Sequence, residues 1–184
     1  MQKNIYLVGF MGTGKSTIGK ELARLTGRKF IDMDLMLEKR LGMTIGEVFE
    51  AKGELFFRAE EKKLAFELAE THNRVIATGG GTILDEDIKA TFASHGIMIC
   101  LITDRGNLIS RLNRTDKRPL LKGEALEERV ARLMEERKDI YDKIPLKVDT
   151  TNLSPKEAAE KIVNLFKIRQ KILDQLQNQY IIIS

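Results

Sequence analysis

Residues 9–17, with the sequence G-F-M-G-T-G-K-S-T, constrain the fold of this chain most, because they have the form G-x-x-x-x-G-K-[ST]. They follow the apolar residues 5–8, which are typical of a buried strand. They precede a segment in which Ile18, Leu22 and Leu25 share one face of a helix. We therefore expect a strand, a glycine-rich loop and a helix in immediate succession.

This arrangement predicts a site for the phosphates of a nucleotide. Glycines allow successive backbone N–H groups to turn inward around an anion, and the start of the helix adds the positive end of its dipole. Lys15 can then reach the outer phosphates, and the Ser16 hydroxyl suits Mg²⁺. The motif leaves open whether the nucleotide is ATP or GTP. The residues expected at the phosphates are Gly12, Thr13, Gly14, Lys15, Ser16 and Thr17.

Composition places the chain among ordinary globular proteins. No apolar run approaches the length of a membrane span, and the first residues lead directly into strand-like sequence, so we expect no signal or transit peptide. The single cysteine, Cys100, lies in an apolar run and is expected in the core rather than as a nucleophile. We expect a cytoplasmic protein.

The net charge of +4 and the isoelectric point of about 9.1 raise the possibility of nucleic-acid binding. The positive side chains, however, form no stripe with interleaved aromatic residues, and the chain has no tryptophan to stack on bases. They concentrate at Arg105, Arg111, Arg114, Lys117 and Arg118. Small anionic substrates explain this bias better, and we expect neither a nucleic-acid nor a membrane partner.

Short apolar runs alternate with longer amphipathic ones along the whole chain. Strands are expected at residues 4–8, 29–32, 74–78, 97–102 and 146–149. Helices are expected at residues 15–26, 33–41, 45–52, 53–70, 86–94, 105–112, 125–141 and 155–177. The alternation predicts an α/β fold with a five-stranded parallel sheet, helices on both of its faces and one domain over residues 1–184.

Ligands of parallel sheets bind beyond the carboxyl ends of the strands. This rule predicts that four segments share one rim of the sheet: the phosphate loop and residues 32–34, 79–81 and 103–104. At two helix starts, Thr44 with Glu47 and Ser154 with Glu157 have the spacing of a capping box.

Further motifs follow the phosphate loop in a fixed order. They are D-M-D at 32–34, G-E-L-F-F-R-A-E-E at 53–61, G-G-G at 79–81, R-P-L-L at 118–121, and Arg137 four residues before Tyr141. In this order and spacing, residues 1–165 resemble the shikimate kinases of the P-loop kinase superfamily. The resemblance implies a three-layer fold with a mobile lid, ATP and Mg²⁺ as cofactors, and phosphorylation of the 3-hydroxyl of shikimate in aromatic amino acid biosynthesis.

The resemblance also implies a binding site for the substrate. Arg58 and Arg137 would hold the carboxylate, for which a bidentate guanidinium is the natural partner. Asp34 would accept hydrogen bonds from the ring hydroxyls, as a base or only as an orienting group. Taken alone, Arg58 would be an exposed helix residue paired with glutamates. The other residues placed at the substrate are Phe49, Phe57, Glu61, Gly79, Gly80, Gly81, Pro119 and Leu120.

The two aspartates of the D-M-D motif are expected to have different roles. As the chain leaves the strand, Asp32 and Asp34 are expected to point to different sides. Asp32, through a water, and Ser16, directly, would hold Mg²⁺, while Asp34 faces the substrate. A simpler alternative is that Asp34 caps the following helix, which is compatible with a binding role.

Residues 113–124 are polar and basic, and the resemblance makes them a lid that excludes water from the reaction. Arg118 in this segment would contact the transferring phosphoryl group, and with Lys15 and Asp34 it completes the expected catalytic set. Arg111 and Pro155 would frame the adenine.

Two alternative functions remain open. A kinase of gluconate or another polyhydroxy acid would also use two arginines such as Arg58 and Arg137. A non-catalytic nucleotide-binding module would not need the intact catalytic set. Nothing in the sequence demands more than a monomer, although residues 166–184 lie outside the resemblance and end in an apolar run.

Overall fold

The structure, a computed structural model, describes residues 3–113 and 126–181, and for residues 169–181 it describes the backbone alone. Five strands form one sheet in the order β2-β3-β1-β4-β5, and every neighbouring pair is parallel. The strands are β1 (Asn4–Val8), β2 (Lys29–Asp32), β3 (Arg74–Ala77), β4 (Gly96–Ile102) and β5 (Lys147–Asp149). The predicted α/β class, strand number and parallel arrangement are confirmed.

The connections between the strands are helical, as a parallel sheet requires. The helices are α1 (Lys15–Thr26), α2 (Met33–Leu41), α3 (Ile45–Ala69), α4 (Glu86–His95), α5 (Arg105–Leu112), α6 (Leu126–Asp142) and α7 (Pro155–Ile181). The sequence did not predict the 3₁₀ turn η1 (Thr82–Leu84), which follows the glycine triplet. Among the described residues, no helix combines the length and apolar character needed to cross a bilayer.

Two hydrophobic cores lie on opposite faces of the sheet. All five residues of β1 are buried, and alternate side chains of a strand point to opposite faces. Tyr6 and Val8 enter the core shared with α2 to α6, whereas Ile5 and Leu7 enter the core shared with α1 and α7. The sheet is therefore the middle of three layers, as expected.

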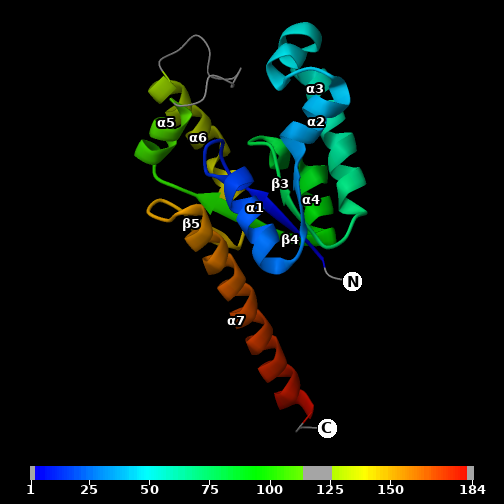
Figure 1. Cartoon of the computed structure of the whole chain (residues 1–184), viewed down its shortest axis with the longest axis vertical. Coiled ribbons are helices and arrows are strands. Elements are labelled where there is room, and N and C mark those ends of the chain that lie inside the picture. Colours follow the sequence, from blue (N-terminus) through cyan, green and yellow to red (C-terminus); the bar gives the residue numbers. More distant parts are fainter. Residues whose placement is uncertain (1–2, 114–125, 182–184) are drawn as a thin grey trace.

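The helices beyond the carboxyl ends of the strands form two walls. In Figure 1, α2 and α3 rise on one side of the loop between β1 and α1, and α5 and α6 rise on the other. Helix α7 starts beside β5 and extends away from the sheet toward the C-terminus. The walls thus place residues from distant parts of the sequence around the loop at residues 9–14.

Helix α3 is divided at Gly53, which has φ 81° and ψ 167°. The sequence predicted two helices there, at residues 45–52 and 53–70, and the interruption agrees with that division. Side chains other than glycine rarely adopt a positive φ. The first half begins with the predicted capping box, in which Thr44 and Glu47 bond each other's backbone N–H groups.

Candidate active site

The phosphate loop connects β1 to α1. Gly12 and Gly14 have φ values of 83° and 92°, and Gly14 occupies the N-cap position of α1 with no side-chain cap. The first backbone N–H groups of a helix have no partner within the helix, so this end of α1 is suited to bind an anion. The Thr13 hydroxyl donates to the carbonyl of Phe10 at 2.8 Å and closes the loop on itself.

Lys15 lies folded over this loop. Its Nζ atom donates to the carbonyls of Gly9 at 2.8 Å and Phe10 at 3.0 Å, and the residue is only 9% exposed. Ser16 and Thr17 are exposed in the first turn of α1. The ammonium therefore lies over the loop, and the two hydroxyls lie in the helical turn that follows it.

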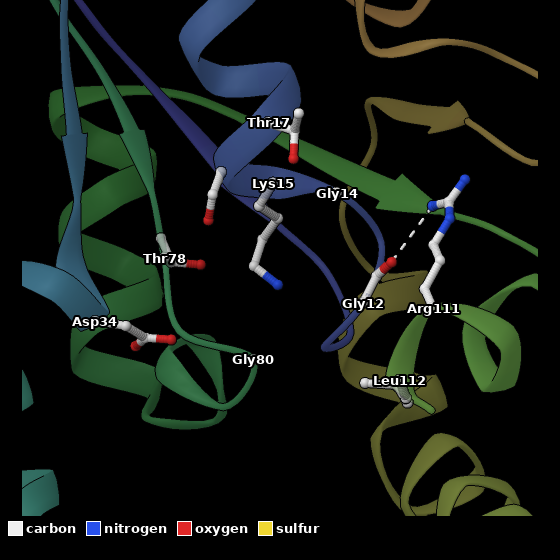
Figure 2. A pocket seen from close by; sticks show the side chains of 10 residues that line it. Gly12, Gly14, Lys15, Thr17, Asp34, Thr78, Gly80, Arg111 and Leu112 are labelled. Atoms are coloured by element: carbon white, nitrogen blue, oxygen red, sulfur yellow. Dashed lines mark hydrogen bonds between the residues drawn. The ribbon is translucent and has the colours of Figure 1, made fainter. Parts of the chain in front are cut away.

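A cavity of about 370 Å³ opens in front of the loop. Figure 2 shows Lys15 in its middle, with Asp34 on one side and Arg111 on the other. Arg111 Nη1 donates to the carbonyl of Gly12 at 3.3 Å, so this arginine contacts the phosphate loop directly. The lining residues are Gly12, Gly14, Lys15, Ser16, Thr17, Asp34, Thr78, Gly80, Arg111 and Leu112.

The two aspartates occupy different structural positions. Asp32 ends β2 and is the N-cap of α2, where its carboxylate accepts from the N–H of Leu35 at 3.3 Å. Asp34 lies in the first turn of α2 and lines the cavity. The cap is therefore Asp32, and the alternative that Asp34 serves as the cap is wrong. Residues i and i+2 of a strand share a face, so strand geometry does not separate Asp32 from Asp34. The two side chains point apart because α2 begins at Met33.

Arg58 is held by two carboxylates of its own helix. Its Nη1 atom lies 2.6 Å from Glu61 Oε2, and Nε and Nη2 lie 3.2 and 3.0 Å from Glu54 Oε1. Glu61 is 2% exposed, and its second oxygen accepts from the Thr82 hydroxyl at 2.6 Å. Burial alone would lower the pKa of Arg58, but Glu61 and Glu54 outweigh it and raise the pKa. The guanidinium is thus charged and fixed in direction.

The glycine triplet packs against these charged groups. A Cβ atom at Gly79 would lie 2.8 Å from both Asp34 Oδ1 and Glu61 Oε1, and one at Gly81 would lie 3.0 Å from Arg58 Nη2. Larger residues would push these side chains apart. From the sequence, we explained the glycines here by a ligand that approaches the backbone. The structure gives a second reason, which is that the carboxylates of Asp34 and Glu61 and the guanidinium of Arg58 also lie close to this backbone.

Arg137 reaches the same triplet from α6. It is 7% exposed, its Nη1 atom donates to the carbonyl of Gly80 at 3.1 Å, and its Cζ atom lies 5.7 Å from the ring centre of Phe10. Such a distance is within the range of a cation–π contact. Asp34, Arg58 and Arg137 therefore all border residues 79–81, although they come from three different helices.

The remaining predicted residues fall into three groups. Phe49 and Phe57 come from the two halves of α3 and pack with their ring centres 5.0 Å apart. Pro155 is exposed at the start of α7 and is not among the described residues that line the cavity. The third group lies outside the described residues: it comprises Arg118, Pro119, Leu120 and the rest of the expected lid except Asn113.

Sequence reasoning assigned no role to several residues that the structure places at the site. Thr78 and Leu112 line the cavity, Thr82 bonds Glu61, and Tyr141 donates its hydroxyl to the carbonyl of Gly80. The position of Thr78 between a strand and the glycine triplet could have indicated it. Thr82 gave no such signal, because its role depends on a turn without periodicity.

Comparison with known proteins identifies the family. The sequence model of the family described as shikimate kinase matches residues 11–167. The chain belongs to the shikimate kinase family. A shikimate kinase of Thermodesulfovibrio yellowstonii is 39% identical over 165 residues, which cover 90% of this chain and 95% of the relative. A shikimate kinase of Bacillus licheniformis is 41% identical over 170 residues, which cover 91% of this chain and 96% of the relative.

Solved structures of the shikimate kinase family have the same fold. The shikimate kinase of Acinetobacter baumannii in complex with shikimate has a TM-score of 0.88 and 35% identity, and the match covers 92% of this chain and 95% of that one. A gluconokinase of Sinorhizobium meliloti has a TM-score of 0.58 at 14% identity, which shows a shared fold alone. The predicted kinase class is confirmed, and shikimate kinase is favoured over the two alternatives.

Proposed function

We propose that this member of the shikimate kinase family transfers the terminal phosphoryl group of ATP to the 3-hydroxyl of shikimate. The hydroxyl oxygen forms a bond to the γ-phosphorus, the bond from that phosphorus to the β–γ bridging oxygen breaks, and the hydroxyl proton passes to Asp34 or to water. The products are ADP and shikimate 3-phosphate. One observation carries the proposal: Lys15 and Asp34 line the same cavity, and Arg58 and Arg137 meet the glycine triplet beside it.

The acceptor would be held by its carboxylate and its hydroxyls. Arg58 and Arg137 supply two guanidinium groups around residues 79–81, and a guanidinium can hold a carboxylate by two parallel hydrogen bonds. Asp34 is on the cavity side of the triplet, where its carboxylate would accept a hydrogen bond from the reacting hydroxyl. Phe49 and Phe57 would form an apolar wall against the ring.

Transfer of a phosphoryl group depends mainly on positioning and on neutralising charge. Lys15 supplies a cation at the phosphate loop, and we propose that Arg118 supplies a second one. The other proposed ATP contacts are the backbone and side chains of residues 12–17, Arg111 and Pro155. Of these, Arg111 has the firmest support, since it lines the cavity and bonds the loop.

The residues near the phosphate loop fit Mg²⁺. Ser16 is exposed beside the loop, and Asp32 supplies a carboxylate at the end of β2, on the same rim of the sheet and separated from β1 by β3. Among the described residues no three His, Cys, Asp or Glu side chains gather as a metal site. That fits an ion that prefers oxygen ligands, keeps several waters and completes its shell with phosphate oxygens. When bound, Mg²⁺ would neutralise charge on the phosphates.

An assay of ADP release tests this function. The protein is incubated with ATP, Mg²⁺ and one acid at a time, using shikimate, quinate and gluconate. We expect ADP release with shikimate, at least tenfold less with the other two acids, and loss of turnover when EDTA removes Mg²⁺. Turnover of gluconate without turnover of shikimate would overturn the substrate assignment and keep the kinase assignment.

A further inference from the structure

Tyr141 is a buried polar group beside the site that the proposed reaction leaves without a role. It lies in α6 one helical turn after Arg137, so that both side chains point to the same face. It is 9% exposed, and its hydroxyl donates to the carbonyl of Gly80. The carbonyl oxygen of Gly80 also accepts a hydrogen bond from Arg137 Nη1 at 3.1 Å. One backbone oxygen is thus shared by a tyrosine and by an arginine of the proposed carboxylate site.

The Gly80 carbonyl belongs to a peptide unit that lies between the acceptor side and the phosphate side of the cavity. The N–H group of the same peptide bond belongs to Gly81. In a planar trans peptide, the C=O and the N–H point in opposite directions. A Cβ atom at Gly81 would lie 3.0 Å from Arg58 Nη2, and one at Gly80 would lie 3.2 Å from the backbone nitrogen of Met11 in the phosphate loop. Fixing this carbonyl therefore fixes a peptide between Arg58 and the phosphate loop.

A segment of three glycines needs such a tether from outside. Glycine has the largest backbone freedom of all residues, and the triplet has no side chains with which to anchor itself. Arg137 alone is a poor tether, because a carboxylate ligand would compete for its N–H groups. With the Tyr141 hydroxyl in place, Arg137 can turn toward a ligand while the Gly80 oxygen keeps a donor.

We propose that Tyr141 is a positioning residue for the acid substrate. Its hydroxyl holds the Gly80–Gly81 peptide in place, so that Arg137 can turn from the Gly80 carbonyl to the substrate carboxylate. The inference rests on the function proposed above. Burial raises the pKa of Tyr141 to about 12, so the hydroxyl keeps its proton and remains a donor at neutral pH.

The test is the variant Tyr141→Phe, which removes the hydroxyl and keeps the ring in the core. We expect the KM for shikimate to rise about 3- to 10-fold, the effect of losing one hydrogen bond. The KM for ATP and kcat should each change less than about twofold, because Lys15 and the phosphate loop are untouched. Steady-state ADP release with each substrate varied in turn measures the three constants.

Tyr6→Phe is the matched control. Tyr6 is fully buried, and its hydroxyl accepts from Asn4 at 3.3 Å. It lies in β1, and Asn4 ties that region to Leu68 and Thr71, away from the glycine triplet. We expect this variant to lose some thermal stability while both KM values stay at the wild-type level. If Tyr141→Phe behaves in the same way, Tyr141 has only a structural role and the proposal is overturned.

An NMR measurement on the wild-type protein tests the proposal even if the variant Tyr141→Phe does not fold. The chain has three tyrosines, so labelling with ¹³Cζ-tyrosine gives three resonances, which Tyr6→Phe and Tyr180→Phe assign. Saturation with shikimate should shift the resonance of Tyr141 and leave that of Tyr6 in place. An unmoved Tyr141 resonance in a saturated site overturns the proposal. Failure of the wild type to phosphorylate shikimate would overturn the proposed function itself, and this inference with it.

Discussion

The phosphate side and the acceptor side of the cavity differ in how far apart in the sequence their residues lie. On the phosphate side, the Thr13 hydroxyl and the Lys15 ammonium donate to carbonyls at most six residues away, while Arg111 reaches the Gly12 carbonyl across 99 residues. On the acceptor side, Thr82 bonds Glu61 across 21 residues and Arg137 bonds Gly80 across 57. The phosphate loop itself is a local structure, whereas the acceptor side is assembled by the packing of three helices on the sheet.

This difference predicts how each side responds to substitution. A change on the phosphate side should alter the transfer step and leave the rest of the cavity in place. A change to the arginines of the acceptor side should alter the affinity for the acid, whereas a change to Asp34, which faces the reacting hydroxyl, should alter the transfer step. The experiments that follow test this division, from the largest expected effect to the smallest.

Replacing Lys15 by alanine should have the largest effect. It removes the ammonium that the loop holds near the phosphates, and loss of one group that stabilises charge in a transition state costs on the order of 10³-fold in kcat. The KM for shikimate should change little, which ADP-release kinetics with varied shikimate would show. Lys20→Ala, at an exposed position of α1, is the control. A kcat within threefold of wild type in Lys15→Ala would contradict the division.

Asp34→Asn should lower kcat about 100-fold, the usual scale for losing a group that handles or orients a reacting proton. Its place against Gly79 would be kept by a side chain of the same shape. Steady-state ADP release at saturating ATP and shikimate measures kcat, and a kcat within threefold of wild type would remove Asp34 from the catalytic set. Asp139→Asn, on the exposed side of α6, controls for charge.

Arg58→Lys should raise the KM for shikimate about 10-fold and change the KM for ATP little. A lysine keeps the charge but has no planar fork with which to hold a carboxylate, Glu61 and Glu54 at once. Arg40→Lys is a matched control, because Arg40 bonds both oxygens of Glu67 at an exposed position. Equal effects of the two variants on the KM for shikimate would remove Arg58 from the proposed site.

Much of the fold could be predicted because its signals are local. The strand at residues 4–8 is apolar from Ile5 to Val8, and the break at Gly53 separates two stretches with helical periodicity. The capping spacing of Ser154 and Glu157 also produced the expected pair of bonds. Errors were confined to element ends, such as β4 beginning at Gly96, and to the short turn η1, which has too few residues to show a period.

The site was harder to predict where a residue's partner is distant. D-M-D indicated two aspartates but not which of them caps α2, because that depends on where the helix begins. The position of Tyr141 was noticed as part of a motif, yet its bond to Gly80 requires α6 to pack beside the glycine triplet. The roles of the site residues, the cytoplasmic location and the monomeric state stay predictions.

The sequence by itself determined the phosphate loop, the alternation of strands and helices, and membership of the shikimate kinase family. These features depend on backbone preferences and on contacts within a few residues, which a linear pattern records. Only the tertiary structure decided that Asp34, Arg58, Arg137 and Tyr141 gather at one glycine triplet. That gathering depends on the placement of β3 beside β1 and on helices packed over one face of the sheet, so it arises from long-range contacts that no short segment contains.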